Sequence, residues 1–185
     1  MRIRPLQTGE AGTLRAVRLQ AVEDAPHAFG QTRFEAANLP LSHWERAVKT
    51  HTDGQSGVVF FAGAENTPPI GLISVRRDTF VSTDAHIGQL WVAPEWRRAG
   101  TGGALVGAAL YWAKRQKVGR LLTWTPQDSA ALRLFRRVGF TISGRQFPQP
   151  GNPQLMLCEL VCVLTSAETA LPTEAISDAR EPIAA

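Results

Sequence analysis

The chain has 185 residues, of which 44% are hydrophobic and 19% are charged. This length and balance favour one folded domain with a substantial core, and they disfavour a fully disordered chain or a multidomain protein. No run of 18 apolar residues occurs, so we expect no membrane span, no signal peptide and no membrane partner, and therefore a cytoplasmic protein.

The charge divides the chain into two parts. The net charge is +4, but residues 165–185 contain four acidic residues and one arginine, which leaves +7 on residues 1–164. We expect residues 1–164 to form the folded domain and residues 165–185, rich in Ala, Thr, Glu and Pro, to be a disordered tail. A basic domain favours an anionic ligand. Nucleic acid is a minor hypothesis, because no Lys/Arg run exceeds two residues.

In chain order, the first half is predicted to contain a strand, two helices around a loop or partial helix at 24–40, and three strands. Thr8 is expected to cap the first helix, and Ser42 with Glu45 to form a capping box on the second. The expected ranges are strand 3–6, helices 8–22 and 41–49, an antiparallel pair 58–64 and 70–76, and strand 85–92.

The second half is predicted to begin with the longest helix, which Gly119 ends. A buried parallel strand, an amphipathic helix and a final strand pair follow. The expected ranges are helix 101–117, strand 121–125, helix 129–138, and strands 140–147 and 154–164. This order predicts an α+β or mixed α/β fold with helices on the faces of a sheet.

Neither a disulfide nor a metal site is expected. Cys158 and Cys162 lie four residues apart in a predicted strand, which would separate their Cα atoms by roughly 13 Å, too far for a disulfide. The four histidines are scattered without a metal-ligand spacing.

Residues 90–105 carry the most informative pattern, in which a strand-like apolar run passes through two arginines and three glycines into the longest helix. Gly100, Gly102 and Gly103 allow backbone N–H groups to approach an oxyanion closely, and the positive end of the helix points to the same place. Arg97 and Arg98 add forked donors, which suits a pyrophosphate. The competing explanation is that the glycines serve only the tight packing of a strand-to-helix turn.

Two other phosphate-binding loops fit this segment poorly. A dinucleotide fingerprint needs a glycine where Leu105 stands and an acidic residue about 20 positions later, where none occurs. A nucleoside-triphosphate loop needs a lysine after its spacer, and Ala108 follows instead.

The segment Arg97-Arg98-Ala99-Gly100-Thr101-Gly102 resembles the acyl-CoA signature Gln/Arg-x-x-Gly-x-Gly/Ala of the GCN5-related N-acetyltransferases, the GNAT superfamily. The preceding Leu90-Trp91-Val92-Ala93-Pro94 resembles the fourth strand of that family. Residues 128–140, ending in Arg136-Arg137-Val138-Gly139-Phe140, resemble its fourth helix and the following turn. The resemblance covers roughly residues 1–163, and residues 2–5 and 24–30 are similar to small-molecule members.

The resemblance implies a mostly antiparallel sheet of six to seven strands with helices on both faces, splayed between strands four and five. It implies acetyl-CoA as co-substrate, with the pantetheine arm in the splay and a backbone N–H near Val92 facing the thioester oxygen. The cofactor-binding residues that it implies are Leu90, Trp91, Val92, Arg97, Arg98, Gly100, Thr101, Gly102, Gly103, Ala104, Asp128, Ala131 and Phe135.

This sequence departs from the family pattern at two of those positions. Many relatives carry a tyrosine that protonates the leaving thiolate where Phe135 stands, and phenylalanine has no proton to donate. Asp128 replaces the usual asparagine at the start of that helix, where its side chain can still form the cap.

His86 is the leading candidate for the general base. It lies eleven positions before Arg97, where branches of the family place a glutamate or histidine, and imidazole titrates near neutrality. A structural histidine is the competing interpretation. Glu35, Asp84, Glu159 or a chain of waters are weaker alternatives.

The acceptor pocket is expected where the first two helices meet the final strands, with Phe29, Gly30 and Glu35 as candidate substrate-binding residues. Glu35 could hold a cationic amine. The leading hypothesis is acetyl transfer from acetyl-CoA to the primary amine of a small molecule or amino-acid-like acceptor by direct attack. A protein or peptide amine, or an acetyl-CoA-binding regulatory domain with little turnover, are the alternatives. Family resemblance also implies a homodimer formed through the final strands.

Overall fold

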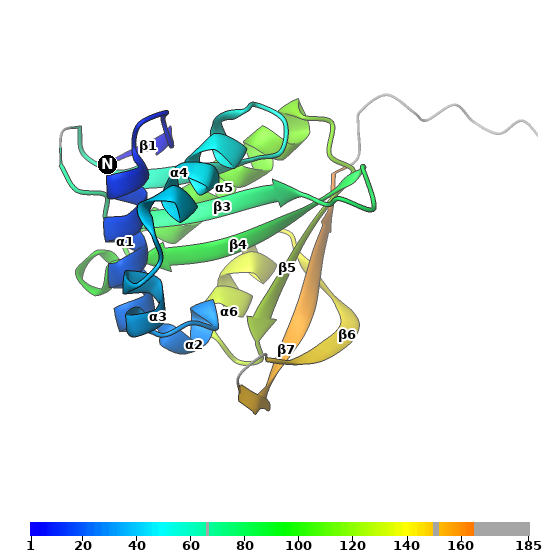
Figure 1. Ribbon diagram of the computed structural model, residues 1–185. Coiled ribbons are helices and arrows are strands. Elements are labelled where there is room, and N and C mark those ends of the chain that lie inside the picture. The colour runs from blue at the N-terminus through cyan, green and yellow to red at the C-terminus, as the bar shows by residue number, and fades with distance from the viewer. Residues whose placement is uncertain (66, 150–151, 165–185) are drawn as a thin grey trace, which may run out of the picture.

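A computed structural model describes residues 1–65, 67–149 and 152–164 of the chain, and the predicted tail at 165–185 lies outside these residues. Seven strands form one sheet in the order β1–β2–β3–β4–β5–β7–β6 (Figure 1). Within the described residues, only β4 and β5 are parallel, and every other neighbouring pair is antiparallel. The strands are β1 (Arg2–Pro5), β2 (Gly57–Gly63), β3 (Gly71–Arg77), β4 (Asp84–Val92), β5 (Arg120–Pro126), β6 (Thr141–Gln149) and β7 (Asn152–Val163). The predicted mixed, mostly antiparallel sheet is confirmed.

Helices cover both faces of the sheet. The helices before β2 are α1 (Ala11–Asp24), α2 (Pro26–Phe29), α3 (Arg33–Ala37) and α4 (Leu41–Thr52), and the later ones are α5 (Thr101–Arg115) and α6 (Ala130–Arg137). On one face, Val17 of α1 and Trp44 of α4 pack in a cluster with Trp91 of β4. On the other face, Leu105 of α5 and Phe135 of α6 join the main core. Among the described residues, no helix is both long and apolar enough to cross a bilayer.

The parallel strands β4 and β5 separate soon after they meet. Their pairing covers only Asp84 with Arg120, Ala85 with Leu121 and His86 with Leu122. Beyond His86, β4 bulges at Gln89, where φ is +57°, and follows β3, whereas β5 pairs with β7 along its whole length. Figure 1 shows the two strands diverging. The expected splay is therefore present, and it begins at His86.

The predicted helix caps are wrong in the first half of the chain. The helix α1 begins at Ala11, and its N-cap residue Glu10 directs its carboxylate to the guanidinium of Arg4 (2.7 and 2.8 Å) and to the backbone N–H of Gln7 (2.7 Å). The Glu10 carboxylate thus binds Arg4 and Gln7 instead of the first turn of α1, and Thr8 lies outside the helix.

The capping box lies on a different helix from the one expected. The helix α4 starts directly after Pro40 without a side-chain cap, whereas Thr32 and Glu35 form the box on α3. The Thr32 backbone has the extended conformation that an N-cap residue needs.

Asp128 does not cap α6, because Ser129 does. The Ser129 hydroxyl accepts a hydrogen bond from the Leu132 N–H (3.0 Å), and its backbone is extended as an N-cap requires. Asp128 has φ +62°, so its backbone lacks the extended conformation of an N-cap residue.

Candidate active site

The loop between β4 and α5 leaves the start of α5 open. After a short 3₁₀ turn, η1 (Pro94–Trp96), the backbone is left-handed at Arg98 (φ +64°) and again at Gly100 (φ +85°). Gly100 is the N-cap residue of α5 and offers no side chain to the first-turn N–H groups. These unpaired donors and the positive end of a 15-residue helix therefore face one place, which is the arrangement that binds phosphate oxygens.

Gly102 lies where three elements converge. A Cβ atom on Gly102 would lie 3.0 Å from Cδ2 of Leu134 in α6 and 4.0 Å from Cγ2 of Val92 in β4, whereas one on Gly103 would meet no atom within 4 Å. Thr101 is buried, and its hydroxyl points to the Trp96 carbonyl (3.4 Å). The fold thus brings the predicted glycine loop to the end of β4, beside the splay.

Arg97 is held by neighbours within the protein. Its Nε donates to the Val92 carbonyl (2.9 Å), and its guanidinium forms an ion pair with Asp24 at the end of α1. The same Oδ2 atom of Asp24 accepts a hydrogen bond from Nε1 of Trp91 (2.8 Å). Arg98, by contrast, is exposed.

Asp24 was missed by sequence reasoning. It lies 67 residues from Trp91 and 73 residues from Arg97 in the chain, so no local pattern could have found it.

The backbone of Val92 faces the splay. The Ala93 N–H donates to the Ile70 carbonyl (2.8 Å), which places it on the β3 side. Successive residues of a strand point their backbone groups to opposite sides, so those of Val92 point away from β3. The side chain of Trp91 is buried against α1 and α4, and those of Leu90 and Val92 are half-buried on the α5 face.

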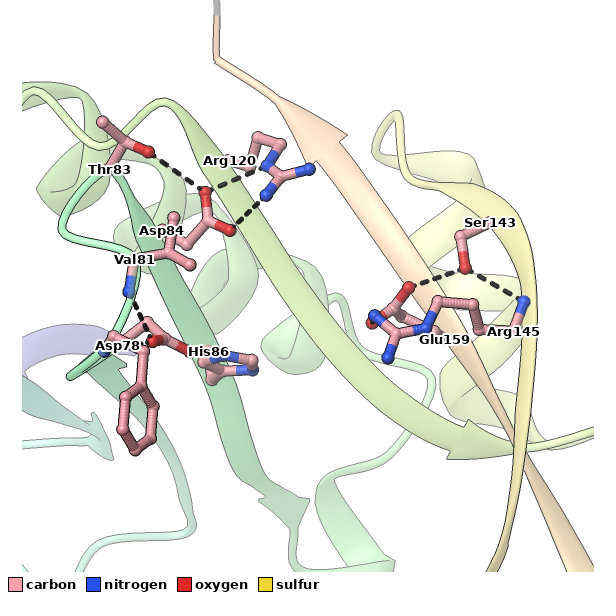
Figure 2. A network of polar contacts seen from close by, with 10 residues as sticks. Asp78, Val81, Thr83, Asp84, His86, Arg120, Ser143, Arg145 and Glu159 are labelled. Atoms are coloured by element: carbon pink, nitrogen blue, oxygen red, sulfur yellow. Dashed lines mark hydrogen bonds and ion pairs between the residues drawn. The ribbon is translucent and has the colours of Figure 1, made fainter.

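His86 lies at the point where the splay begins, and it pairs with Asp78 (Figure 2). Its Nε2 is 2.7 Å from Oδ2 of Asp78, and the other carboxylate oxygen accepts the N–H groups of Phe80 (2.7 Å) and Val81 (2.9 Å). Hydrogen bonds from Val81 and Phe80, then from His86, lower the pKa of Asp78 to about 2. Because the carboxylate is ionised at neutral pH, it accepts a hydrogen bond from Nε2, and in the neutral form of the imidazole this leaves Nδ1 as the acceptor nitrogen.

The alternative carboxylates already have partners. Asp84 is buried and binds Arg120 through two hydrogen bonds (2.9 and 2.5 Å). Glu159 is also buried and accepts from the Ser143 hydroxyl (2.7 Å), as Figure 2 shows, and from Arg145 (3.3 Å).

Glu35 is exposed, and its carboxylate accepts the Thr32 N–H (2.7 Å) and hydroxyl (2.9 Å). These bonds to Thr32 lower the pKa of Glu35 and commit its carboxylate to the cap of α3.

The residues expected near the pantetheine arm differ in exposure. Phe135 is only 2% exposed and packs edge-to-face on Phe140 at 5.1 Å between ring centroids. Ala131 is half-buried against the core, and Asp128 is exposed, with its carbonyl accepting from Arg133 (2.8 Å). The cofactor contacts of all three stay predictions.

The N-terminal acceptor candidates lie at the end of α2. Phe29 is its last residue, and Gly30 follows with φ +59°, the left-handed conformation that ends many helices. The guanidinium of Arg18 in α1 stacks over the Phe29 ring at 4.5 Å.

The residues present fit an acyl-CoA. The uncapped start of α5 suits the phosphates, and the edge of β4 from which β5 has parted beyond His86 offers backbone partners to an extended arm. Gly102 leaves the room that a side chain would fill. When bound there, acetyl-CoA supplies the activated acetyl group.

Known structures share this fold. A GNAT-family acetyltransferase from Streptococcus pneumoniae superposes with a TM-score of 0.76 at 16% identity, covering 89% of this chain and 99% of that one. A ribosomal-protein-alanine N-acetyltransferase from Brucella melitensis gives 0.71 at 22% identity, covering 89% and 100%. A protein from Salmonella typhimurium, solved with its cofactor acetyl-CoA, gives 0.73 at 19% identity, covering 94% and 98%.

At these identities the likeness shows the fold, and the family rests on the sequence. None of the curated proteins matches the chain. The model of the acetyltransferase (GNAT) family, however, matches residues 19–140, which is more than half of the chain and includes β4, the glycine loop and α6. The chain therefore belongs to the acetyltransferase (GNAT) family, and it is an acyl-CoA-dependent N-acetyltransferase with acetyl-CoA as its co-substrate.

Proposed function

We propose that this protein transfers the acetyl group of acetyl-CoA to the primary amine of a small molecule or an amino-acid-like acceptor by direct attack, with His86 as general base. The observation that carries the proposal is the His86–Asp78 pair at the point where β4 and β5 part. Asp78 is a positioning residue in this proposal, because it holds the imidazole by Nε2 and leaves Nδ1 for the acceptor.

The chemistry balances in one displacement. The amine nitrogen forms the new C–N bond to the acetyl carbon, and Nδ1 of His86 takes the proton from that nitrogen. The C–S bond breaks, and the thiolate takes a proton from water, because Phe135 has none to give. In this proposal the Val92 N–H, which points away from β3, stabilises negative charge on the carbonyl oxygen.

The co-substrate site that we propose follows β4, the glycine loop and α6. Backbone groups of β4 hold the pantetheine arm, the start of α5 holds the pyrophosphate, and α6 closes the other side. The proposed residues are Leu90, Trp91, Val92, Arg97, Arg98, Gly100, Thr101, Gly102, Gly103, Ala104, Asp128, Ala131 and Phe135.

The natural acceptor class is open to direct test. Similar structures include proteins described as acting on ribosomal-protein alanine and on spermidine. The panel should therefore contain amino acids, polyamines, aminoglycosides and peptides with free N-termini. CoA release from acetyl-CoA, scored against a no-acceptor control, identifies the class. A preference for peptides would replace the small-molecule proposal.

Two variants test the roles of His86 and Asp78. We expect His86→Gln to lower kcat by 10²-fold or more near neutral pH with little change in acetyl-CoA affinity. Asp78→Asn should lower kcat less and change the pH profile, because the partner that selects the tautomer is lost. An unaltered pH profile in His86→Gln would remove His86 as base.

A regulatory domain that binds acetyl-CoA with little turnover is the second candidate, favoured by the missing hydroxyl at Phe135. Confirmed acetyl-CoA binding without CoA release across the whole panel would favour it.

A homodimer through the last strands is also proposed. The edge strand β6 exposes eight of its nine residues, including Ile142 and Phe147 at 49% each. Sedimentation at several protein concentrations checks this.

A further inference from the structure

Arg18 is a half-buried cation without an anionic partner. Within the described residues, its Nη1 atom is shielded from solvent and has no hydrogen-bond partner, and no carboxylate lies within ion-pair distance. Its guanidinium stacks on the ring of Phe29. Burial lowers the pKa of Arg18 to about 10, so the guanidinium is still charged at neutral pH, and its Nη1 atom has lost hydration without gaining a hydrogen bond.

Arg18 differs from several other arginines of the described residues, which have a carboxylate partner. Arg4, Arg97, Arg120 and Arg145 each face a carboxylate. Filling the place of Arg18 with an apolar side chain would keep the packing on Phe29 without the desolvation penalty. A positive charge at position 18 is therefore explained by an anionic partner that does not belong to the chain.

The position of Arg18 on α1 separates it from the phosphate loop. Asp24, six residues later and about 120° away around the helix, reaches the loop residue Arg97. Arg18 lies instead on the flank that meets α2, next to the buried face formed by Leu14 and Ala21. Arg18 and Asp24 therefore lie on two different sides of α1.

We propose that Arg18 binds a carboxylate of the acceptor, so that the substrate class is an amine that also carries a carboxylate, such as a free amino acid. This inference rests on the proposed acetyltransferase function and names its acceptor. The guanidinium offers parallel N–H donors that match a carboxylate, and the Phe29 ring fixes its plane from one side.

The experiment compares amino acids with their carboxamides, which keep the amine and lose the negative charge. The variants are Arg18→Met, which keeps the length and apolar packing, and Arg18→Lys, which keeps the charge. Arg46→Met is the matched control, because it removes one positive charge from an exposed site on α4. A thermal melt of each variant confirms that it is folded.

We expect wild type to prefer the carboxylate form, and Arg18→Met to lose about 30-fold or more in kcat/KM for it while changing less than about threefold for the carboxamide. Arg18→Lys should recover part of the loss, and Arg46→Met should behave as wild type. Calorimetry with N-acetyl amino acids and their amides in the presence of CoA gives a second readout that needs no turnover.

These readouts separate the two proposals. Equal kcat/KM for amino acids and their carboxamides, with no change in Arg18→Met, would refute the role of Arg18. The proposed acetyltransferase function would not be affected by that result. No acetylation of any amine, together with Arg18-dependent binding of N-acetyl amino acids, supports the carboxylate site and refutes the proposed function. Absence of both effects refutes both.

Discussion

Replacing Asp24 with alanine should destabilise the protein by about 2 kcal/mol. Asp24 accepts the indole N–H of Trp91, whose side chain is buried among α1, α4 and the sheet, at 2.8 Å. Leaving a buried donor without a partner costs about 1–3 kcal/mol. The ion pair with Arg97 adds roughly 0–1 kcal/mol, because the Arg97 side chain is 46% exposed and water screens the pair.

Urea unfolding of a matched set of variants tests this reasoning. Asp24→Asn keeps an oxygen for the indole N–H and should lose no more than about 1 kcal/mol. Glu23→Ala removes the neighbouring carboxylate, whose pair with Arg33 is exposed on both sides, and should change stability by less than about 0.5 kcal/mol. Equal losses of unfolding free energy in Asp24→Ala and Asp24→Asn would refute the conclusion that most of the loss comes from the unpaired indole N–H of Trp91.

The Asp24→Ala variant should also weaken acetyl-CoA binding. Asp24 fixes Arg97, which also holds the Val92 carbonyl, so the loop before α5 is tied to α1 and β4. Without that tie, ordering the loop becomes part of the binding free energy, about 0.5–1.5 kcal/mol for a side chain of this kind. We expect an increase in Kd of roughly 2- to 12-fold by calorimetry.

Three further predictions concern other parts of the site and fold. Gly102→Asp should weaken acetyl-CoA binding by more than about 30-fold, and the neutral, equally large Gly102→Asn should weaken it less, because a carboxylate at the start of α5 repels phosphates; equal Kd values by calorimetry would show that bulk alone acts. Ser129→Ala should cost about 1 kcal/mol in urea unfolding and Asp128→Ala close to nothing, since only Ser129 caps α6. The lowered pKa of Asp78, about 2 against 3.8 ordinarily, gives a stabilising contribution that is complete above pH 4 and is lost as pH falls toward 2. The stability difference between wild type and Asp78→Asn should therefore shrink as pH falls from 5 toward 2, and a difference that did not change over this range would contradict this account.

Sequence reasoning located the parts of the fold that local patterns determine. The order of strands and helices, the parallel strand after the longest helix and the glycine loop all follow from hydrophobic period, glycine placement and family resemblance. Helix starts were less predictable, because side-chain partners and backbone conformation, rather than residue type alone, decide which residue caps a helix. Glu10 turns to Arg4, and Ser129 takes the place expected for Asp128.

The sequence by itself thus determined the family, the co-substrate and the identity of the leading catalytic candidate, because these depend on residues close together in the chain. Only the tertiary structure decided which groups surround them. Asp78 meets His86 across the β3–β4 hairpin, Asp24 reaches Arg97 from a separate helix, and Arg18 stays unpaired against Phe29. The physical reason is that hydrogen bonds and charge pairs depend on distance in space, and a long-range contact leaves no periodic signal in the sequence.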